Sequence, residues 1–404
     1  MRFLIPTARC PNPRSYIVLL LTVMAYGAVN NVVFSILPLI GIELGLAPKQ
    51  ITLIGSCAAL TVFLVSPWWG RRSDVWGRRT SILIGVGGYC FSALLLVLWF
   101  ALSRSGWLDT DQLYICIFAS RLLQAFLIAA MLPAITAYVI DITSAEERAV
   151  GLSQTGAAHG LGAIIGPSLV VLAGWSLLLP LYVAVGLAML IAGLVYRYLA
   201  EPGKHHDNVY SADSRAMKRP GYFDSRYRHL LLVGVVIYLG MAVSTQMMGF
   251  YLPYVLSLDP SRAAGALGLV QACMAAATVF GQLVLVQRLA WSPQRLLGVG
   301  LPLMVTGFVL LATAGGLLQL MLSMLFLGLG LGISGPGFSA SVSLSVNANE
   351  QGAVAGFLAA CPALGYVVGP FGAGVLYEWH PRLPFVVVVV FLLAAWSILR
   401  LRQG

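Results

Sequence analysis

The sequence predicts an all-α integral membrane protein in which twelve transmembrane helices form two pseudo-symmetric six-helix bundles. Three observations support this fold class. Of the 404 residues, 59% are hydrophobic and only 9% are charged, a composition that is not typical of soluble domains. Apolar runs of about 20 residues, long enough to cross a bilayer as helices, recur along the chain. The two halves of the chain also repeat weakly.

The apolar runs predict twelve spans in chain order, each separated from the next by a polar or short segment. The first six cover residues 15–40, 51–69, 80–103, 112–140, 150–173 and 176–198. The last six cover residues 229–256, 262–286, 295–316, 318–344, 351–376 and 384–400. The polar stretch 201–228 separates the two sets. We therefore expect a six-helix bundle over residues 1–200, a cytoplasmic linker over 201–228 and a second bundle over 229–404.

The positions of the basic residues predict the orientation, because Lys and Arg near helix ends are retained in the cytoplasm. With the N-terminus inside, the cytoplasmic segments hold 19 of the 24 Lys and Arg residues. We therefore expect a multi-pass protein of the cell inner membrane with both termini in the cytoplasm. The net charge of +10 follows from this topology and gives no reason to expect a nucleic-acid partner.

The loop between the second and third spans is the most informative segment. It reads Gly70-Arg-Arg-Ser-Asp74-Val-Trp-Gly77-Arg78-Arg79. Such a charge cluster cannot lie in hydrocarbon, so it predicts a short loop on one membrane face.

The fourth span carries Arg121 and Gln124, which share one face of a helix. An arginine inside a span costs at least about 3 kcal/mol unless it faces water or a partner. A role in a polar path is the favoured interpretation, and a structural arginine satisfied by helix carbonyls is the alternative.

The fifth span contains Gly162, Gly166 and Pro167, and a shift of 203 positions places them on Gly365, Gly369 and Pro370 of the eleventh span. Glycines four residues apart let two helices approach closely, and a proline removes one backbone donor, so the helix can bend. A parallel repeat of six spans is typical of transporters that bind their substrate at the midplane between two bundles.

The architecture and these motifs resemble the major facilitator superfamily, and within it the twelve-helix drug:proton antiporter branch, over the whole chain. In that family, the loop matched by Gly70, Asp74, Gly77, Arg78 and Arg79 forms an inner gate with the neighbouring bundle, and Asp141 is similar to its acidic patch after helix four. Arg121 with Gln124 is similar to the second motif, and Gly162, Gly166 and Pro167 resemble the antiporter signature, although Ser168 replaces the first glycine of its usual Gly-Gly pair. For the basic loop, a membrane anchor with no gating role remains the alternative. For Asp141 and its acidic neighbours, a purely solvated loop remains the alternative. The resemblance implies proton-driven export.

The carboxylates suggest the charge of the substrate. All fourteen acids fall in loops or near span ends, whereas antiporters for cationic drugs generally carry an embedded acid. The polar residues expected to line the path are Asn30, Asn31, Arg121, Gln124, His159, Gln246 and Gln271. Their net positive charge favours an anionic or zwitterionic ligand. His159 could carry the coupled proton or serve helix packing.

The sequence therefore predicts a proton-coupled exporter of a small organic molecule, such as a carboxylate siderophore or metallophore. Three alternatives remain: a multidrug antiporter for lipophilic cations, an importer or uniporter of the same fold, and a membrane enzyme or receptor on a transporter scaffold. No phosphate-binding loop occurs, and the six scattered cysteines suggest neither disulfides nor a metal site. We expect no enzymatic activity, cofactor or metal, and a monomer whose partners are its substrate, protons and the lipid bilayer.

Overall fold

The structure is a computed structural model that describes residues 13–143, 148–201, 224–289, 291–346 and 351–401. Within these ranges nearly every residue is helical, and twelve helical segments are long and apolar enough to cross a membrane. The predicted all-α, twelve-span fold class is confirmed.

The first half of the chain supplies six of the spans. Its helices are α1 (Pro13–Glu43), α2 (Pro48–Trp76), α3 (Arg78–Arg104), α4 (Thr110–Ile128), α5 (Met131–Ile142), α6 (Arg148–Ser168), the 3₁₀ segment η2 (Leu169–Gly174) and α7 (Leu179–Tyr198). The fourth span is broken between α4 and α5, because Pro133 has no N–H to donate to the carbonyl of Ala129. Pro167 likewise precedes the change from α6 to the 3₁₀ segment.

The second half supplies the other six spans. Its helices are α8 (Arg228–Leu256), α9 (Pro260–Phe280), the π-helical segment η4 (Gly281–Leu285), α10 (Val286–Leu289), α11 (Pro293–Ala312), α12 (Leu317–Leu344), α13 (Gln351–Trp379) and α14 (Leu383–Leu401). The segments α9, η4 and α10 together make one span.

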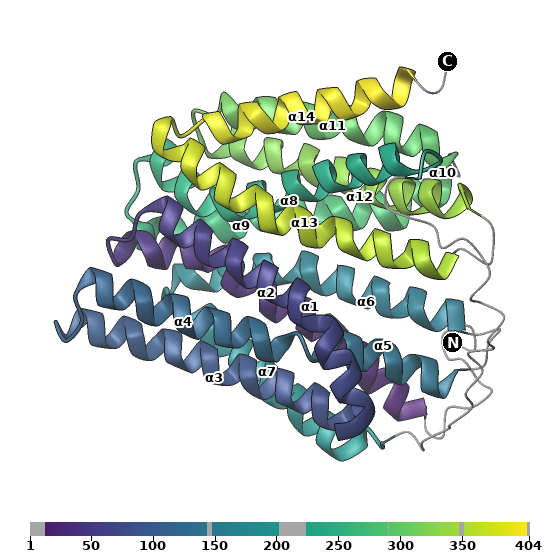
Figure 1. Ribbon diagram of the computed structural model, residues 1–404. Helices are drawn as coiled ribbons and strands as arrows, with labels where there is room; N and C mark the ends of the chain where they lie inside the picture. The colour runs from purple at the N-terminus through teal and green to yellow at the C-terminus, as the bar shows by residue number, and fades with distance from the viewer. Residues whose placement is uncertain (1–12, 144–147, 202–223, 290, 347–350, 402–404) are drawn as a thin grey trace.

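The helices gather into two groups, which Figure 1 shows one above the other. We call α1 to α7 with η2 the first bundle and α8 to α14 with η4 the second bundle. Within the first bundle α1 packs on α6 and α7, and within the second α8 packs on α13 and α14. The bundles meet where α2 contacts α13, α6 contacts α9 and α1 contacts α8.

The two ends of the molecule differ in charge. At one end, where α1 begins and α14 ends (Figure 1), lie the arginines of residues 71–79 together with Arg197, Arg228 and Arg400. We call this the basic end, and the end where α1 gives way to α2 the opposite end. Each acidic residue that the structure describes lies at or near a helix terminus or outside the helices, so no described carboxylate lies at a midplane.

The glycine-rich spans form equivalent seams in the two bundles. A Cβ at Gly162 or Gly166 of α6 would overlap the backbone of α1. A Cβ at Gly365 of α13 would lie 2.7 Å from the backbone nitrogen of Leu239 in α8, and one at Gly369 would lie 3.2 Å from the carbonyl oxygen of the same residue. The repeat detected in the sequence therefore corresponds to the same close helix pairing in each half.

Candidate functional site

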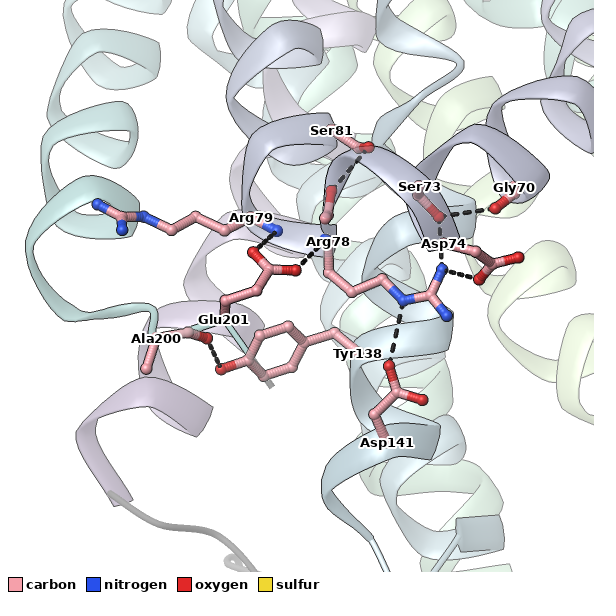
Figure 2. Close-up of polar contacts among 11 residues, drawn as sticks. Gly70, Ser73, Asp74, Arg78, Arg79, Ser81, Tyr138, Asp141, Ala200 and Glu201 are labelled. Carbon is pink, nitrogen blue, oxygen red and sulfur yellow. Dashed lines mark hydrogen bonds and ion pairs between the residues drawn. The ribbon is translucent and has the colours of Figure 1, made fainter. Parts of the chain in front are cut away.

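Arg78 organises residues 70–79 at the basic end. The structure builds the segment expected as a loop from the last turns of α2, Gly77 and the start of α3, and we keep the name loop for these ten residues. Its guanidinium lies 2.5 Å from Asp74 and 3.1 Å from Asp141, and it also donates to Ser73 over 2.6 Å. Figure 2 shows the guanidinium held between the two carboxylates. The pair with Asp74 is local, four residues apart, whereas the pair with Asp141 fixes the loop to the end of α5.

Glu201, which follows α7, binds the start of α3. Its two carboxylate oxygens accept hydrogen bonds from the backbone N–H groups of Arg78 and Arg79 (Figure 2). The first N–H groups of a helix have no partner within the helix itself, and negative charge is favourable at this helix end. Gly77 makes the approach possible: its φ is +96°, and a Cβ there would lie 2.8 Å from the Glu201 carboxylate.

Further contacts tie the same loop to its neighbours. Arg79 donates to the carbonyl of Tyr196, and its guanidinium stacks 4.8 Å above the ring of that tyrosine. Tyr138 of α5 donates to the carbonyl of Ala200 over 2.8 Å. Gly70 accepts from Ser73 over 2.8 Å.

We call this group the basic-end cluster, and its members are Gly70, Ser73, Asp74, Gly77, Arg78, Arg79, Tyr138, Asp141 and Glu201. The structure thus brings together all six residues that the sequence predicts for the gate. The contacts described above stay within the first bundle, so a gate with the second bundle remains a prediction. Glu201 was not among the gate residues predicted from the sequence. The sequence feature that indicates it is an acidic residue directly after a span, on the same membrane face as the arginines of residues 71–79.

Removing the Glu201 carboxylate is expected to loosen the start of α3. Glu201→Ala leaves two N–H groups of the first turn without their acceptor, and we expect a loss of about 1 kcal/mol, as for other helix caps. Thermal unfolding of the purified protein measures the change. Glu201→Gln retains an acceptor without the charge and is expected to lose less. Equal stability of all three proteins would contradict the capping role.

At the opposite end the two bundles are in direct contact. Lys49 and Glu378 form an ion pair of 3.2 Å between α2 and α13. About two turns deeper in α13, the backbone N–H of Phe371 donates to the hydroxyl of Ser56 over 3.1 Å. The segments η2 and α9 also approach closely, since a Cβ at Gly268 of α9 would lie 2.0 Å from the backbone nitrogen of Val171 in η2. These contacts close the opposite end in this conformation.

Breaking the Lys49–Glu378 pair is expected to favour separation of the bundles at the opposite end. Both side chains are partly exposed, at 57% and 29%, so the pair contributes no more than about 1 kcal/mol. In Lys49→Glu we expect a several-fold rise in the open population. The measurement is the distance distribution between spin labels at Arg104→Cys and Leu318→Cys in a cysteine-free background. The double exchange Lys49→Glu with Glu378→Lys should restore the original distribution, and failure to do so would exclude a charge effect.

Arg121 and Gln124 lie on the buried face of α4. Arg121 is 5% exposed and Gln124 is 2% exposed. The Nε of Arg121 and the Nε2 of Gln124 are both enclosed without a hydrogen-bond partner among the described residues. Tyr89 of α3, which the sequence analysis missed, lies within electrostatic range of Arg121, and its buried hydroxyl is also unpaired. A tyrosine inside an apolar span carries no sequence signal that distinguishes such a position from ordinary packing.

The other path candidates of the first bundle lie along the seam of α1 and α6. Asn31 is buried and donates to the carbonyl of Gly27 over 2.8 Å, so its amide is partly satisfied within its own helix. Asn30 is half-buried. The ring of His159 lies 5.4 Å from the ring of Tyr26 on α1.

The second bundle contributes Gln246 and Gln271. Gln246 is fully buried, and neither its amide nitrogen nor its amide oxygen has a partner in the part of the chain that the structure describes. It reaches the first bundle, since a Cβ at Gly55 of α2 would lie 2.9 Å from its Nε2. Gln271 donates to the carbonyl of Thr245 over 3.2 Å.

Gln271 and Thr245 also line a small crevice between the bundles. Its walls come from α6, α8, α9 and α12 and consist of Ala163, Ile164, Pro167, Met241, Thr245, Gln271, Met274, Ala275, Thr278 and Leu331. The described wall residues carry amide, hydroxyl and thioether groups but no formal charge. The crevice therefore offers hydrogen-bonding groups between the two bundles without a charge of its own in the part of the chain that the structure describes.

Comparison with known proteins identifies relatives over most of the chain. The family model described as Major Facilitator Superfamily matches residues 18–361 and 235–403. Multidrug resistance protein 1 of Bacillus subtilis (strain 168) is 26% identical over 366 residues, which is 90% of this chain and 89% of that protein.

Two solved structures share the fold. A bacterial homologue of the human lysosomal transporter Spinster, in an inward-facing and occupied conformation, aligns with a TM-score of 0.70 at 16% identity, covering 98% of each chain. The human organic anion transporter MFSD10 (TETRAN) aligns with a TM-score of 0.64 at 21% identity, covering 97% of this chain and 100% of that chain.

Proposed function

Since the chain belongs to the major facilitator superfamily and is a multi-pass membrane transporter, we propose that it exports a small organic anion or zwitterion in exchange for protons. The observation that carries the proposal is Arg121. Among the residues that the structure describes, it is the one Lys, Arg, Asp or Glu near the middle of a span. It is buried, and no described carboxylate is paired with it.

An unpaired guanidinium in a membrane interior favours a negatively charged partner. The electrostatic attraction between opposite charges is much stronger in a site of low dielectric constant than in water. Arginine in addition presents several N–H donors that match a carboxylate. An anionic substrate compensates the charge of Arg121, whereas a lipophilic cation would be repelled by it. MFSD10, which shares the fold, is an organic anion transporter, and its substrate class agrees with this proposal.

The transport cycle we propose is a rocking of the two bundles about the crevice between them. The contacts at the opposite end, Lys49 with Glu378 and Ser56 with Phe371, must break when that end opens. Arg78 and its carboxylate partners keep the first bundle rigid at the basic end and contribute to the gate there. Asn31, Gln246 and Gln271 line the path.

His159 is the proposed carrier of the coupled proton. It is a midspan side chain of a type that titrates near neutral pH, and it lies on the seam of α1 and α6 beside Tyr26. We place the basic end in the cytoplasm of the cell, following the bias of Lys and Arg. The transporter is proposed to act as a monomer in the inner membrane.

A multidrug antiporter for lipophilic cations is the second candidate. It is favoured by the name of the Bacillus subtilis relative, a multidrug resistance protein that matches over 90% of this chain. Against it, each acidic residue that the structure describes lies at or near a helix terminus or outside the helices, which leaves a buried cation without a counter-charge.

Accumulation in inside-out membrane vesicles separates the two candidates. The probes are radiolabelled carboxylates, beginning with citrate, and the cationic dye ethidium, each with and without an interior-acid proton gradient. Gradient-driven accumulation of a carboxylate supports the anion exporter. Accumulation of ethidium alone would overturn the proposal and favour the multidrug candidate. Equal accumulation of the carboxylate with and without the proton gradient would contradict proton coupling.

A further inference from the structure

Three buried donors of the first bundle point to a site inside that bundle, and one of them, Tyr89, is not part of the path described above. They are the hydroxyl of Tyr89, the Nε of Arg121 and the Nε2 of Gln124, and each is enclosed without a hydrogen-bond partner within the described ranges. The three side chains are between 1% and 5% exposed. Burying one unpaired polar group costs about 1–3 kcal/mol, and more when the group is charged. Three such groups in one region favour a partner that supplies hydrogen-bond acceptors.

The packing of α3 against α4 places the three residues at one level. The hydroxyl of Ser92 on α3 donates to the carbonyl of Ser120 on α4 over 3.1 Å. About one turn away, a Cβ at Gly88 would lie 2.4 Å from the side chain of Leu127. The helices are antiparallel, so Tyr89, which directly follows Gly88, is level with the later part of the stretch between Ser120 and Leu127, close to Gln124. That stretch contains Arg121 and Gln124.

A small apolar cavity adjoins Tyr89. It is lined by residues of α1, α3, α4, α5 and α7, including Tyr89 and Ile128. Ile128 lies four residues after Gln124 and seven after Arg121, so the three share one stripe of α4. The cavity is inside the first bundle and is separate from the crevice between the bundles, since the two share no lining residue.

We propose that Tyr89, Arg121 and Gln124 form a carboxylate-binding subsite inside the first bundle, which takes the head of an organic acid whose apolar part occupies the adjoining cavity. This inference rests on the proposed function, because it assumes that the transported molecule is an organic anion. A carboxylate offers two oxygens with about four acceptor positions, and it provides no donor. It therefore matches a group of three donors, one of them charged. A neutral amide of the same shape brings donors of its own and leaves the arginine charge uncompensated.

Tyr89 is the residue that this subsite adds to Arg121 and Gln124. The proposal is tested by removing only the hydroxyl oxygen of Tyr89. Benzoate binding to the purified chain in lipid nanodiscs is measured by isothermal titration calorimetry, with benzamide as the neutral analogue of the same shape. Benzoate should bind at least about tenfold more tightly than benzamide, as expected for a hydrogen bond to a charged group. Tyr89→Phe keeps the ring in the cavity wall and removes the hydroxyl, and it should weaken benzoate about tenfold.

Tyr26→Phe is the matched control, because Tyr26 lines the same cavity and its hydroxyl is not among the enclosed, unpaired groups. This variant should bind benzoate as the unchanged protein does. The subsite is overturned if the unchanged protein binds neither compound, if benzamide binds equally well, or if the two tyrosine variants behave alike. Its failure is distinct from failure of the proposed function: vesicles that accumulate a carboxylate, with benzoate affinity unchanged in Tyr89→Phe, would exclude the subsite and leave the anion exporter standing.

Discussion

Replacing Gly162 with alanine is expected to destabilise the first bundle strongly. A Cβ at this position would overlap the carbonyl oxygen of Met24, at 1.9 Å, and would lie 2.9 Å from the backbone nitrogen of Ala28. The atoms it meets belong to the backbone of α1 and cannot turn away as a flexible side chain would. The two helices must separate, at a cost on the order of 3 kcal/mol.

The same helix offers a matched control. Gly160 and Gly156 also lie in α6, and a Cβ at either position would meet nothing within 4 Å. Gly160→Ala should be neutral or slightly stabilising, because alanine is the better helix former. Melting temperatures of the unchanged protein and the two variants, followed by size-exclusion chromatography after heating, measure the difference. If Gly162→Ala and Gly160→Ala melt alike, the close seam of α1 and α6 does not support the fold.

Arg121→Gln is expected to abolish transport of organic anions while leaving the protein folded. Removing the charged partner of a buried anion costs on the order of 3 kcal/mol, which corresponds to roughly a hundredfold loss in transport at low substrate concentration. Arg121→Lys keeps the charge but loses the planar fork of donors, so an intermediate rate is expected. The initial rate of carboxylate uptake into inside-out vesicles measures both effects.

Stability distinguishes this role from a structural one. Among the described residues, the Nε of Arg121 has no hydrogen-bond partner and its charge has no paired carboxylate, so the loss of this charge should not lower the melting temperature. Arg104→Gln is the control for charge alone, because Arg104 is 70% exposed at the opposite end and lies 3.7 Å from Glu43. Normal uptake in Arg121→Gln would contradict the proposed function. Unfolding of that variant would instead indicate an arginine that holds the helices together.

Some features of the site followed from the sequence because their signals are strong. Arg121 stands out because an isolated charge in an apolar run is costly. The basic loop stands out because ten residues hold four arginines and an aspartate between two spans. Glycines at spacing four similarly identified the seams, because side-chain size alone limits how closely two helices approach.

Other features could not be predicted because they depend on which helices are neighbours. Tyr89 is one of 16 tyrosines, and its unpaired hydroxyl becomes notable only when α3 places it level with Gln124. Glu201 looks like a loop acid until the end of α7 is seen beside the start of α3. The ion pair of Lys49 with Glu378 joins two distant parts of the chain, and no local pattern identifies it.

The sequence by itself determined the twelve spans, the family resemblance and the scarcity of embedded acids. These features depend on the transfer of single segments from water to lipid, and that free energy is a sum over local residues. The tertiary structure decided which polar groups lack partners, which end of the molecule is closed and which glycines contact a backbone. These properties depend on the distances between helices. Those distances are set by how the side chains from both halves of the chain pack together.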